Sequence, residues 1–138
     1  MALVLDTSVL LAALDAADPD HGPCARLLTI SREDLIVPVL VLGELDYWCQ
    51  TRLGPDVWPA FLEDVLRGAY EIAAPSAEDL ERCLELQRTY ADLEVGVVDA
   101  SVLALVERLE EERVATLDHR HFATMRPAHV SALELLPG

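Results

Sequence analysis

The sequence of 138 residues contains no lysine and only three cysteines, and no apolar run approaches the length of a membrane span. A transmembrane helix needs roughly 20 apolar residues, so we expect none here. No basic stretch precedes the first apolar residues, and Asp6 interrupts them, so we also expect no signal peptide. Cys24, Cys49 and Cys83 lie far apart without paired spacing. This spacing fits free thiols in a reducing cytoplasm better than a disulfide framework or a zinc site.

The absence of lysine and of a glycine-rich phosphate loop excludes a P-loop nucleotide enzyme. All ten basic residues are arginine, and they face 25 acidic residues, for a net charge of -15. This balance argues against nucleic-acid binding, because contacts to phosphates supply most of that affinity. It favours cations and basic protein partners instead. A protein of this composition that acted on RNA would therefore need a bound metal ion.

Hydrophobic residues make up 52% of the chain, enough for one folded domain spanning residues 1–138. Short aliphatic runs alternate with longer segments of helical period, which predicts an α/β domain with a mainly parallel sheet. Strands are predicted at residues 3–5, 35–37, 70–73, 114–117 and 130–135. Helices are predicted at residues 8–17, 19–30, 38–53, 57–67, 76–90 and 98–109.

Two predicted strands end in an aspartate, Asp6 after residues 3–5 and Asp118 after residues 114–117. In open α/β sheets, ligands bind beyond the carboxyl ends of the strands, so both carboxylates are expected at the functional edge. The alternative role for each residue is a cap on the following helix.

Glu44 and Asp99 each lie in an apolar stretch of a predicted helix. A buried carboxylate is costly unless a cation or metal pairs with it. The alternatives are a solvated helix stripe for Glu44 and a favourable contact with the helix dipole for Asp99. Four clustered carboxylates repel one another, and hard oxygen ligands suit Mg²⁺ or Mn²⁺. Such a metal can lower the pKa of a bound water and stabilise charge on a phosphodiester.

Several polar residues flank these acids. Thr7, Ser8 and Thr116 could orient the strand-end carboxylates by hydrogen bonds, or serve as ordinary caps and turns. Arg120 and Arg126 could hold a phosphate, or form surface salt bridges.

Histidines also follow Asp118 closely. His119 and His121 are two positions apart, a spacing that does not place both on one helix face. We therefore interpret this segment as a polar loop and not as a transition-metal site.

Four blocks of the sequence resemble the PIN-domain ribonucleases, specifically the toxin component of VapBC toxin–antitoxin systems. They are LVLDTSVLLA (3–12), VPVLVLGELD (37–46), VVDASV (97–102) and VATLDHRHF (114–122). One departure is Val39, where a small polar residue would be expected before the helix that carries the glutamate.

The resemblance implies a PIN-like three-layer sandwich, with a parallel sheet of about five strands between helices. It implies that Asp6, Glu44, Asp99 and Asp118 surround one or two Mg²⁺ or Mn²⁺ ions. It also implies a homodimer that cleaves structured RNA, such as transfer or ribosomal RNA. Its partner would be a VapB-like antitoxin, and an acidic toxin suits an antitoxin with a basic blocking segment.

Two other kinds of protein share features with this sequence. A phosphoacceptor signalling domain gathers carboxylates in a similar way but needs a lysine at its site, which this chain lacks. A non-catalytic acidic module that binds a basic protein remains open. Such a module would cleave no RNA, and neutralising Asp6 or Asp99 would leave its metal binding unchanged.

Overall fold

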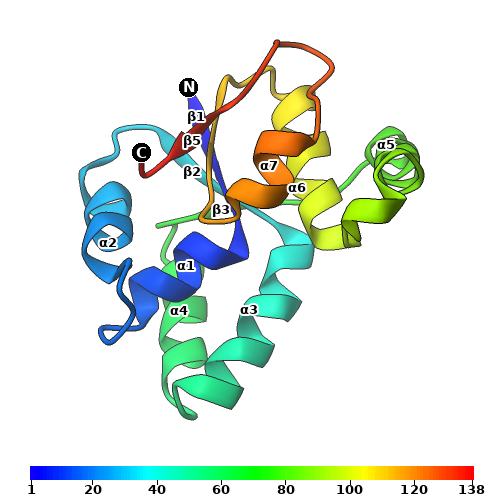
Figure 1. The fold of residues 1–138 in the computed structure, drawn as a ribbon. Helices are drawn as coiled ribbons and strands as arrows, with labels where there is room; N and C mark the ends of the chain where they lie inside the picture. The colour runs from blue at the N-terminus through cyan, green and yellow to red at the C-terminus, as the bar shows by residue number, and fades with distance from the viewer.

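The computed structural model describes residues 1–138 and contains a five-stranded sheet in which every neighbouring pair of strands is parallel. The order across the sheet is β3-β2-β1-β4-β5. This arrangement, surrounded by helices in Figure 1, confirms the predicted α/β class. The strands are β1 (Ala2–Leu5), β2 (Asp34–Pro38), β3 (Glu71–Ala73), β4 (Arg113–Ala115) and β5 (Glu134–Leu136).

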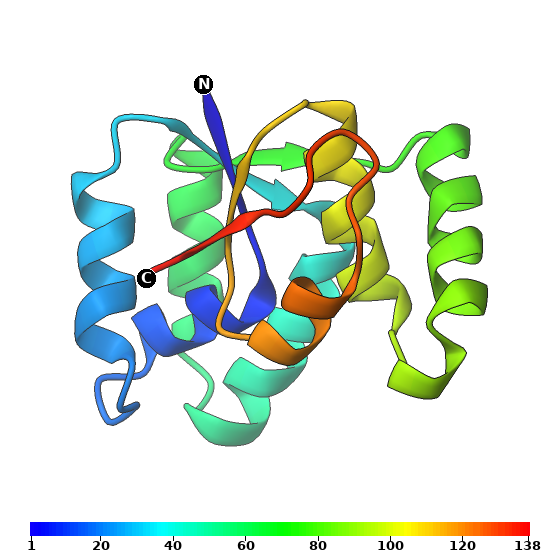
Figure 2. The same cartoon turned by 45° about the horizontal axis from the view of Figure 1, so that its top comes forward.

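Seven α-helices and one short 3-10 helix connect and flank the strands. None of the helices has the length and apolar character needed to cross a membrane. Helix α5 packs against α6 at the far right of Figure 2, and α2 packs against α1 on the opposite side of the molecule. The helices are α1 (Thr7–Leu14), α2 (His21–Ile30), α3 (Val39–Arg52), α4 (Val57–Leu66), α5 (Ala77–Thr89), η1 (Ala91–Leu93), α6 (Val97–Arg108) and α7 (His119–Thr124).

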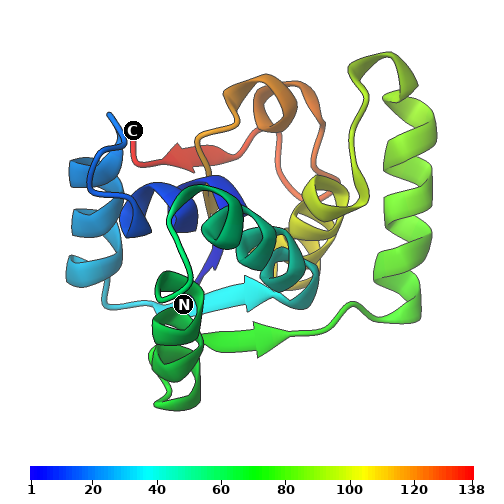
Figure 3. The same cartoon turned by 90° about the horizontal axis from the view of Figure 1, so that it is seen from below.

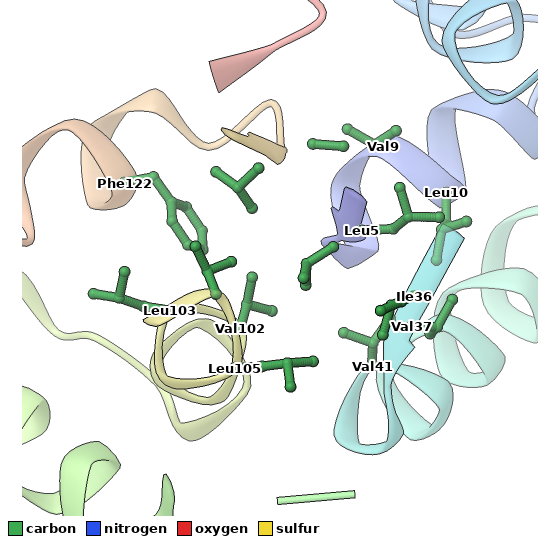
Figure 4. Close-up of a cluster of buried hydrophobic side chains, with 14 of the residues drawn as sticks. Leu5, Val9, Leu10, Ile36, Val37, Val41, Val102, Leu103, Leu105 and Phe122 are labelled. Carbon is green, nitrogen blue, oxygen red and sulfur yellow. The ribbon is translucent and has the colours of Figure 1, made fainter. Parts of the chain in front are cut away.

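The core forms where the central strands meet α1, α3, α6 and α7 (Figure 4). Leu3, Val4 and Leu5 of β1 are all fully buried, as expected for a central parallel strand covered on both faces. Strands β2 and β3 run side by side in the same direction, as seen from below in Figure 3. The core side chains labelled in Figure 4 are Leu5, Val9, Leu10, Ile36, Val37, Val41, Val102, Leu103, Leu105 and Phe122.

Local signals in the sequence set several helix boundaries. Ser76 and Asp79 form the predicted capping box, in which each side chain accepts a hydrogen bond from the other residue's backbone N–H. Gly54 and Gly68 follow α3 and α4 with φ of 91°, a left-handed conformation that favours glycine after a helix.

Some predicted boundaries were wrong. Helix α2 begins at His21 and not at Pro19, because the Asp18 carboxylate accepts the N–H of Asp20 in a local turn instead of capping a helix. Helix α1 ends at Leu14, three residues early. The last strand covers only residues 134–136 of this region. Helix α7 was not predicted, and the segment interpreted as a polar loop is helical.

Candidate active site

The four predicted acids line one open pocket of about 360 Å³ at the carboxyl ends of β1 and β4. They come from four parts of the chain, which converge below the centre of Figure 1. Asp6 follows β1, Glu44 lies within α3, Asp99 is in the first turn of α6, and Asp118 precedes α7. The full lining is Asp6, Thr7, Ser8, Leu11, Glu44, Trp48, Arg52, Asp99 and Asp118.

Asp6 is the most buried of these acids, with 3% of its surface exposed. Its backbone N–H donates to the carbonyl of Ala115 at 2.9 Å, which fixes the end of β1 against β4. Its Oδ2 accepts hydrogen bonds from Ser8 Oγ at 2.9 Å and from Thr116 Oγ1 at 2.8 Å. Its Oδ1 is buried without any partner. One carboxylate oxygen of Asp6 is therefore held by two hydroxyl groups, while the other has no hydrogen-bond partner.

The two hydroxyl groups that hold Asp6 are themselves oriented by the backbone. Ser8 Oγ accepts the N–H of Leu117 at 2.9 Å, and Thr116 Oγ1 accepts the N–H of Asp118 at 3.0 Å. Each hydroxyl proton is thus free to point at Asp6. The side chain of Thr7 makes no orienting bond, because its Oγ1 is buried without a partner, and only the backbone of Thr7 acts on the Asp6 carboxylate.

Asp99 and Asp118 both contact the same ring nitrogen of His121. The Nδ1 atom of His121 lies 2.6 Å from Asp118 Oδ2 and 3.0 Å from Asp99 Oδ2. The Nε2 atom lies 3.0 Å from the carbonyl oxygen of Leu93. Asp118 also caps α7, since its Oδ1 accepts the backbone N–H of His121 at 3.1 Å. Setting His121 aside was therefore wrong. Asp118 and His121 are three residues apart, a spacing that places their side chains together on a helix.

The electrostatics of the pocket favour a bound cation. Burial, and then the charges of Asp6 and Asp118, raise the pKa of Asp99 to about 7. Burial also raises the pKa of Asp6 despite the hydrogen bonds from Thr116 and Ser8. Burial opposes the charged form of His121, but its hydrogen bonds to Asp118 and Leu93 raise its pKa overall. The shifts of the two acids come first from burial and then from neighbouring carboxylates, and a divalent cation fits the oxygen-rich donor set.

Glu44 belongs to a stripe on α3 that continues away from the acids. Trp48 and Arg52 follow it at intervals of four residues, and all three line the pocket. Trp48 is 37% exposed, and the ion pair of Arg52 with Asp15 is long, at 3.8 Å. Trp48 and Arg52 were not predicted as site residues, although their spacing from Glu44 places all three on one face of the helix.

Arg120 and Arg126 do not line this pocket, and both are exposed. The first turn of α7 directs His121 towards the acids and places Phe122 in the core, which leaves Arg120 in solvent. The backbone of Arg126 contacts Tyr90 and Arg82 away from the acids. Arg52 is thus the one arginine in the pocket.

Comparison with known proteins agrees with this geometry. The PIN domain family matches residues 3–126. The chain belongs to the PIN domain family. The resemblance to the toxins of VapBC systems is thereby confirmed. Ribonuclease VapC26 of Mycobacterium tuberculosis (strain ATCC 25618 / H37Rv) is 36% identical over 135 residues, which cover 98% of this chain and 100% of that protein.

Solved structures share the fold of this PIN domain. The Mycobacterium tuberculosis toxin VapC20, described as cleaving the sarcin–ricin loop, superposes with a TM-score of 0.79 at 22% identity. That match covers 94% of this chain and 98% of the toxin. VapBC2 of Rickettsia felis, bound to a promoter DNA fragment, gives a TM-score of 0.68 at 19% identity and covers 98% of both chains.

Proposed function

We propose that this PIN domain is a metal-dependent endoribonuclease, the toxin of a toxin–antitoxin pair, that hydrolyses phosphodiester bonds in structured RNA such as transfer or ribosomal RNA. The observation that carries the proposal is the convergence of four acids in one pocket, one of which, Asp6, has a buried Oδ1 without a partner. The name of the 36% identical relative, a ribonuclease, supports RNA as the substrate.

Asp6, Glu44, Asp99 and Asp118 are the residues that would hold Mg²⁺ or Mn²⁺, because they supply hard oxygen ligands in one pocket. A bound divalent cation supplies two things there, a lower pKa for water and neutralisation of the charge that develops on the phosphodiester. It also reverses the local field, which answers the objection raised by a net charge of -15.

The chain's own residues position the reacting groups. Ser8 and Thr116 hold one oxygen of Asp6 and so fix the orientation of its carboxylate, whose other oxygen has no hydrogen-bond partner. On α3, the exposed face of Trp48 can stack against an unpaired base, and the guanidinium of Arg52 can contact a neighbouring phosphate. We therefore assign to Arg52 the phosphate contact that the sequence had suggested for Arg120 and Arg126.

Partners follow from the same proposal. We expect a VapB-like antitoxin with a basic segment, because an anionic pocket on an acidic protein suits such a ligand. Several of the similar folds come from toxin–antitoxin complexes. We also expect a homodimer, and a cytoplasmic location, since the RNA substrates are cytoplasmic.

The test combines metal binding with RNA cleavage. Calorimetric Mn²⁺ titrations would compare the wild type with the Asp6→Asn/Asp99→Asn double variant, and both would be incubated with ribosomal and transfer RNA. Asp92→Asn is the matched control, because Asp92 is exposed and lies outside the pocket. The wild type and the control should bind Mn²⁺ and cleave RNA, while the folded double variant does neither.

If the protein is instead a non-catalytic acidic module, the opposite results are expected for RNA cleavage and metal binding. No cleavage by the wild type with either RNA at millimolar Mn²⁺, together with equal metal binding by the double variant, would favour that module. Circular dichroism would establish that every variant is folded.

A further inference from the structure

We infer that the imidazole of His121 is a nitrogen ligand of the metal site and makes the site favour Mn²⁺ over Mg²⁺. The inference rests on the proposed function for the existence of the metal site. It goes further by adding a nitrogen to a set of acids that would otherwise offer only oxygen.

The hydrogen bonds of His121 determine which ring nitrogen is available. Its Nε2 faces the carbonyl oxygen of Leu93 at 3.0 Å. A carbonyl oxygen can only accept, so Nε2 carries the hydrogen. In the neutral ring, Nδ1 then presents a lone pair to Asp118 Oδ2 at 2.6 Å and to Asp99 Oδ2 at 3.0 Å. Three electron-pair donors converge on one point, and only a proton or a metal ion between them makes the arrangement attractive.

The 3.0 Å between His121 Nδ1 and Asp99 Oδ2 fits adjacent ligands of a metal ion, whereas the 2.6 Å to Asp118 Oδ2 is the length of a hydrogen bond and must increase when an ion binds. An octahedral ion with ligands at about 2.1 Å places adjacent ligand atoms about 3 Å apart. The ligand atoms of Asp99, Asp118 and His121 all lie within 4.8 Å of one another. A second observation comes from the adjoining pocket, which Asp99 and Asp118 line and His121 does not. Asp6 lines it too, is 97% buried, and its Oδ1 lacks any partner.

The hydrogen bond at the second ring nitrogen of His121 is typical of a metal-binding histidine. Such histidines usually donate their second ring N–H to a backbone carbonyl or a carboxylate, which fixes the tautomer and the ring orientation. The contact between Nε2 and Leu93 meets this description. Leu93 lies in η1, just before α6, so the helix that carries Asp99 and the segment that orients His121 are consecutive in the chain.

The imidazole is not needed to hold α7 in place. Asp118 caps the helix through the backbone N–H of His121, and Phe122 anchors it in the core with 3% of its surface exposed. Replacing the ring should therefore change the donor set while leaving the helix folded.

A nitrogen ligand changes which ion is preferred. Mg²⁺ binds carboxylate and water oxygens and gains little from imidazole. Mn²⁺ accepts the same oxygens but, as a transition metal, also binds imidazole nitrogen. The ratio of Mn²⁺ to Mg²⁺ affinity should therefore depend on His121.

The test compares the wild type with His121→Gln, using His119→Gln as the matched control, because His119 is an exposed histidine on the same helix. Calorimetry would measure Mn²⁺ and Mg²⁺ binding separately. Mn²⁺ affinity should fall about tenfold or more in His121→Gln, since the loss of even an outer partner of a metal ligand costs 10- to 100-fold. Mg²⁺ affinity should change much less, and His119→Gln should match the wild type.

Pulsed electron paramagnetic resonance of bound Mn²⁺ gives a direct readout. Modulation from a coordinated ¹⁴N nucleus should be present in the wild type and in His119→Gln, and absent from His121→Gln. Bound Mn²⁺ without nitrogen coupling in the wild type would overturn the inference, even if His121→Gln did not fold. An equal loss of Mn²⁺ and Mg²⁺ affinity would overturn the Mn²⁺ preference.

The same measurements separate failure of the His121 inference from failure of the proposed function. If the Asp6→Asn/Asp99→Asn variant binds Mn²⁺ as the wild type does, or the wild type binds none, the carboxylate site itself is wrong. If only the nitrogen signal is missing, the carboxylate site stands and His121 serves another role.

Discussion

Replacing Asp99 by Asn should stabilise the metal-free protein above neutral pH. Burial and the neighbouring acids raise the pKa of Asp99 from 3.8 to about 7. Because the folded-state pKa is raised, the contribution of this group to stability is fully present below about pH 4. It is lost as the pH rises towards 7 and above, where Asp99 must ionise among other negative charges.

The size of the effect follows from the same pKa values. At about 1.4 kcal/mol for each tenfold change in the protonation equilibrium, the difference between 3.8 and about 7 corresponds to about 4 kcal/mol at pH 8. Asn resembles the neutral acid but loses the ionic contact with His121, so we expect a net gain of about 2–4 kcal/mol in the free energy of unfolding. At pH 5 the gain should fall below about 2 kcal/mol.

Urea unfolding in EDTA at pH 5 and pH 8 measures this gain. Asp92→Asn, which removes an exposed acid, serves as the control and should change stability by less than about 0.5 kcal/mol. Adding Mn²⁺ at 100 times its dissociation constant should stabilise the wild type by about 2.7 kcal/mol, and Asp99→Asn by much less. An Asn variant that is no more stable than the wild type at pH 8, or equally stabilised at both pH values, would refute the reasoning.

Three further predictions concern residues outside the acid cluster. Trp48→Ala should raise KM for RNA about tenfold with little change in kcat, because stacking contributes about 1–3 kcal/mol per base; an unchanged KM would remove Trp48 from the substrate path. Arg52→Ala should also raise KM in steady-state cleavage assays, whereas Arg120→Ala should not. A rise in KM for Arg120→Ala alone would show that Arg120, and not Arg52, contacts the phosphate. Ser76→Ala should lower the free energy of unfolding by about 1 kcal/mol in urea titrations without affecting cleavage, since it removes only the cap of α5.

The sequence was sufficient to bring Asp6 and Asp118 together because Asp6 directly follows a short, apolar strand and Asp118 comes three residues after another, which ends at Ala115 and not at the predicted Leu117. Parallel strands end at the same edge of a sheet, so the positions of these acids follow from topology alone. The capping box at Ser76 was predictable for the opposite reason, since both of its partners lie within four residues.

The parts that were missed depend on contacts between distant segments or on elements too short to show a period. Helix α7 has six residues, too few for hydrophobic periodicity to reveal, and its place is set by the Asp118 cap and by Phe122 in the core. The role of His121 depends on Asp99 and Leu93, which lie more than 20 residues earlier in the chain. The ion pair of Arg52 with Asp15 depends on the packing of α3 against α1, which no local pattern encodes.

The hydrogen bond between Thr116 and Asp6 joins positions 110 residues apart, and this separation has a consequence during synthesis of the chain. Translation adds about 5–20 residues per second, so about 5 to 20 s pass between the appearance of Asp6 and that of Thr116. Throughout that interval the nascent polypeptide carries Asp6, Glu44 and, later, Asp99, but lacks β4 and the hydroxyl that orients Asp6. Under the proposed function, the acid site is therefore incomplete while the ribosome is still making the chain, and it can be completed only once translation has passed β4.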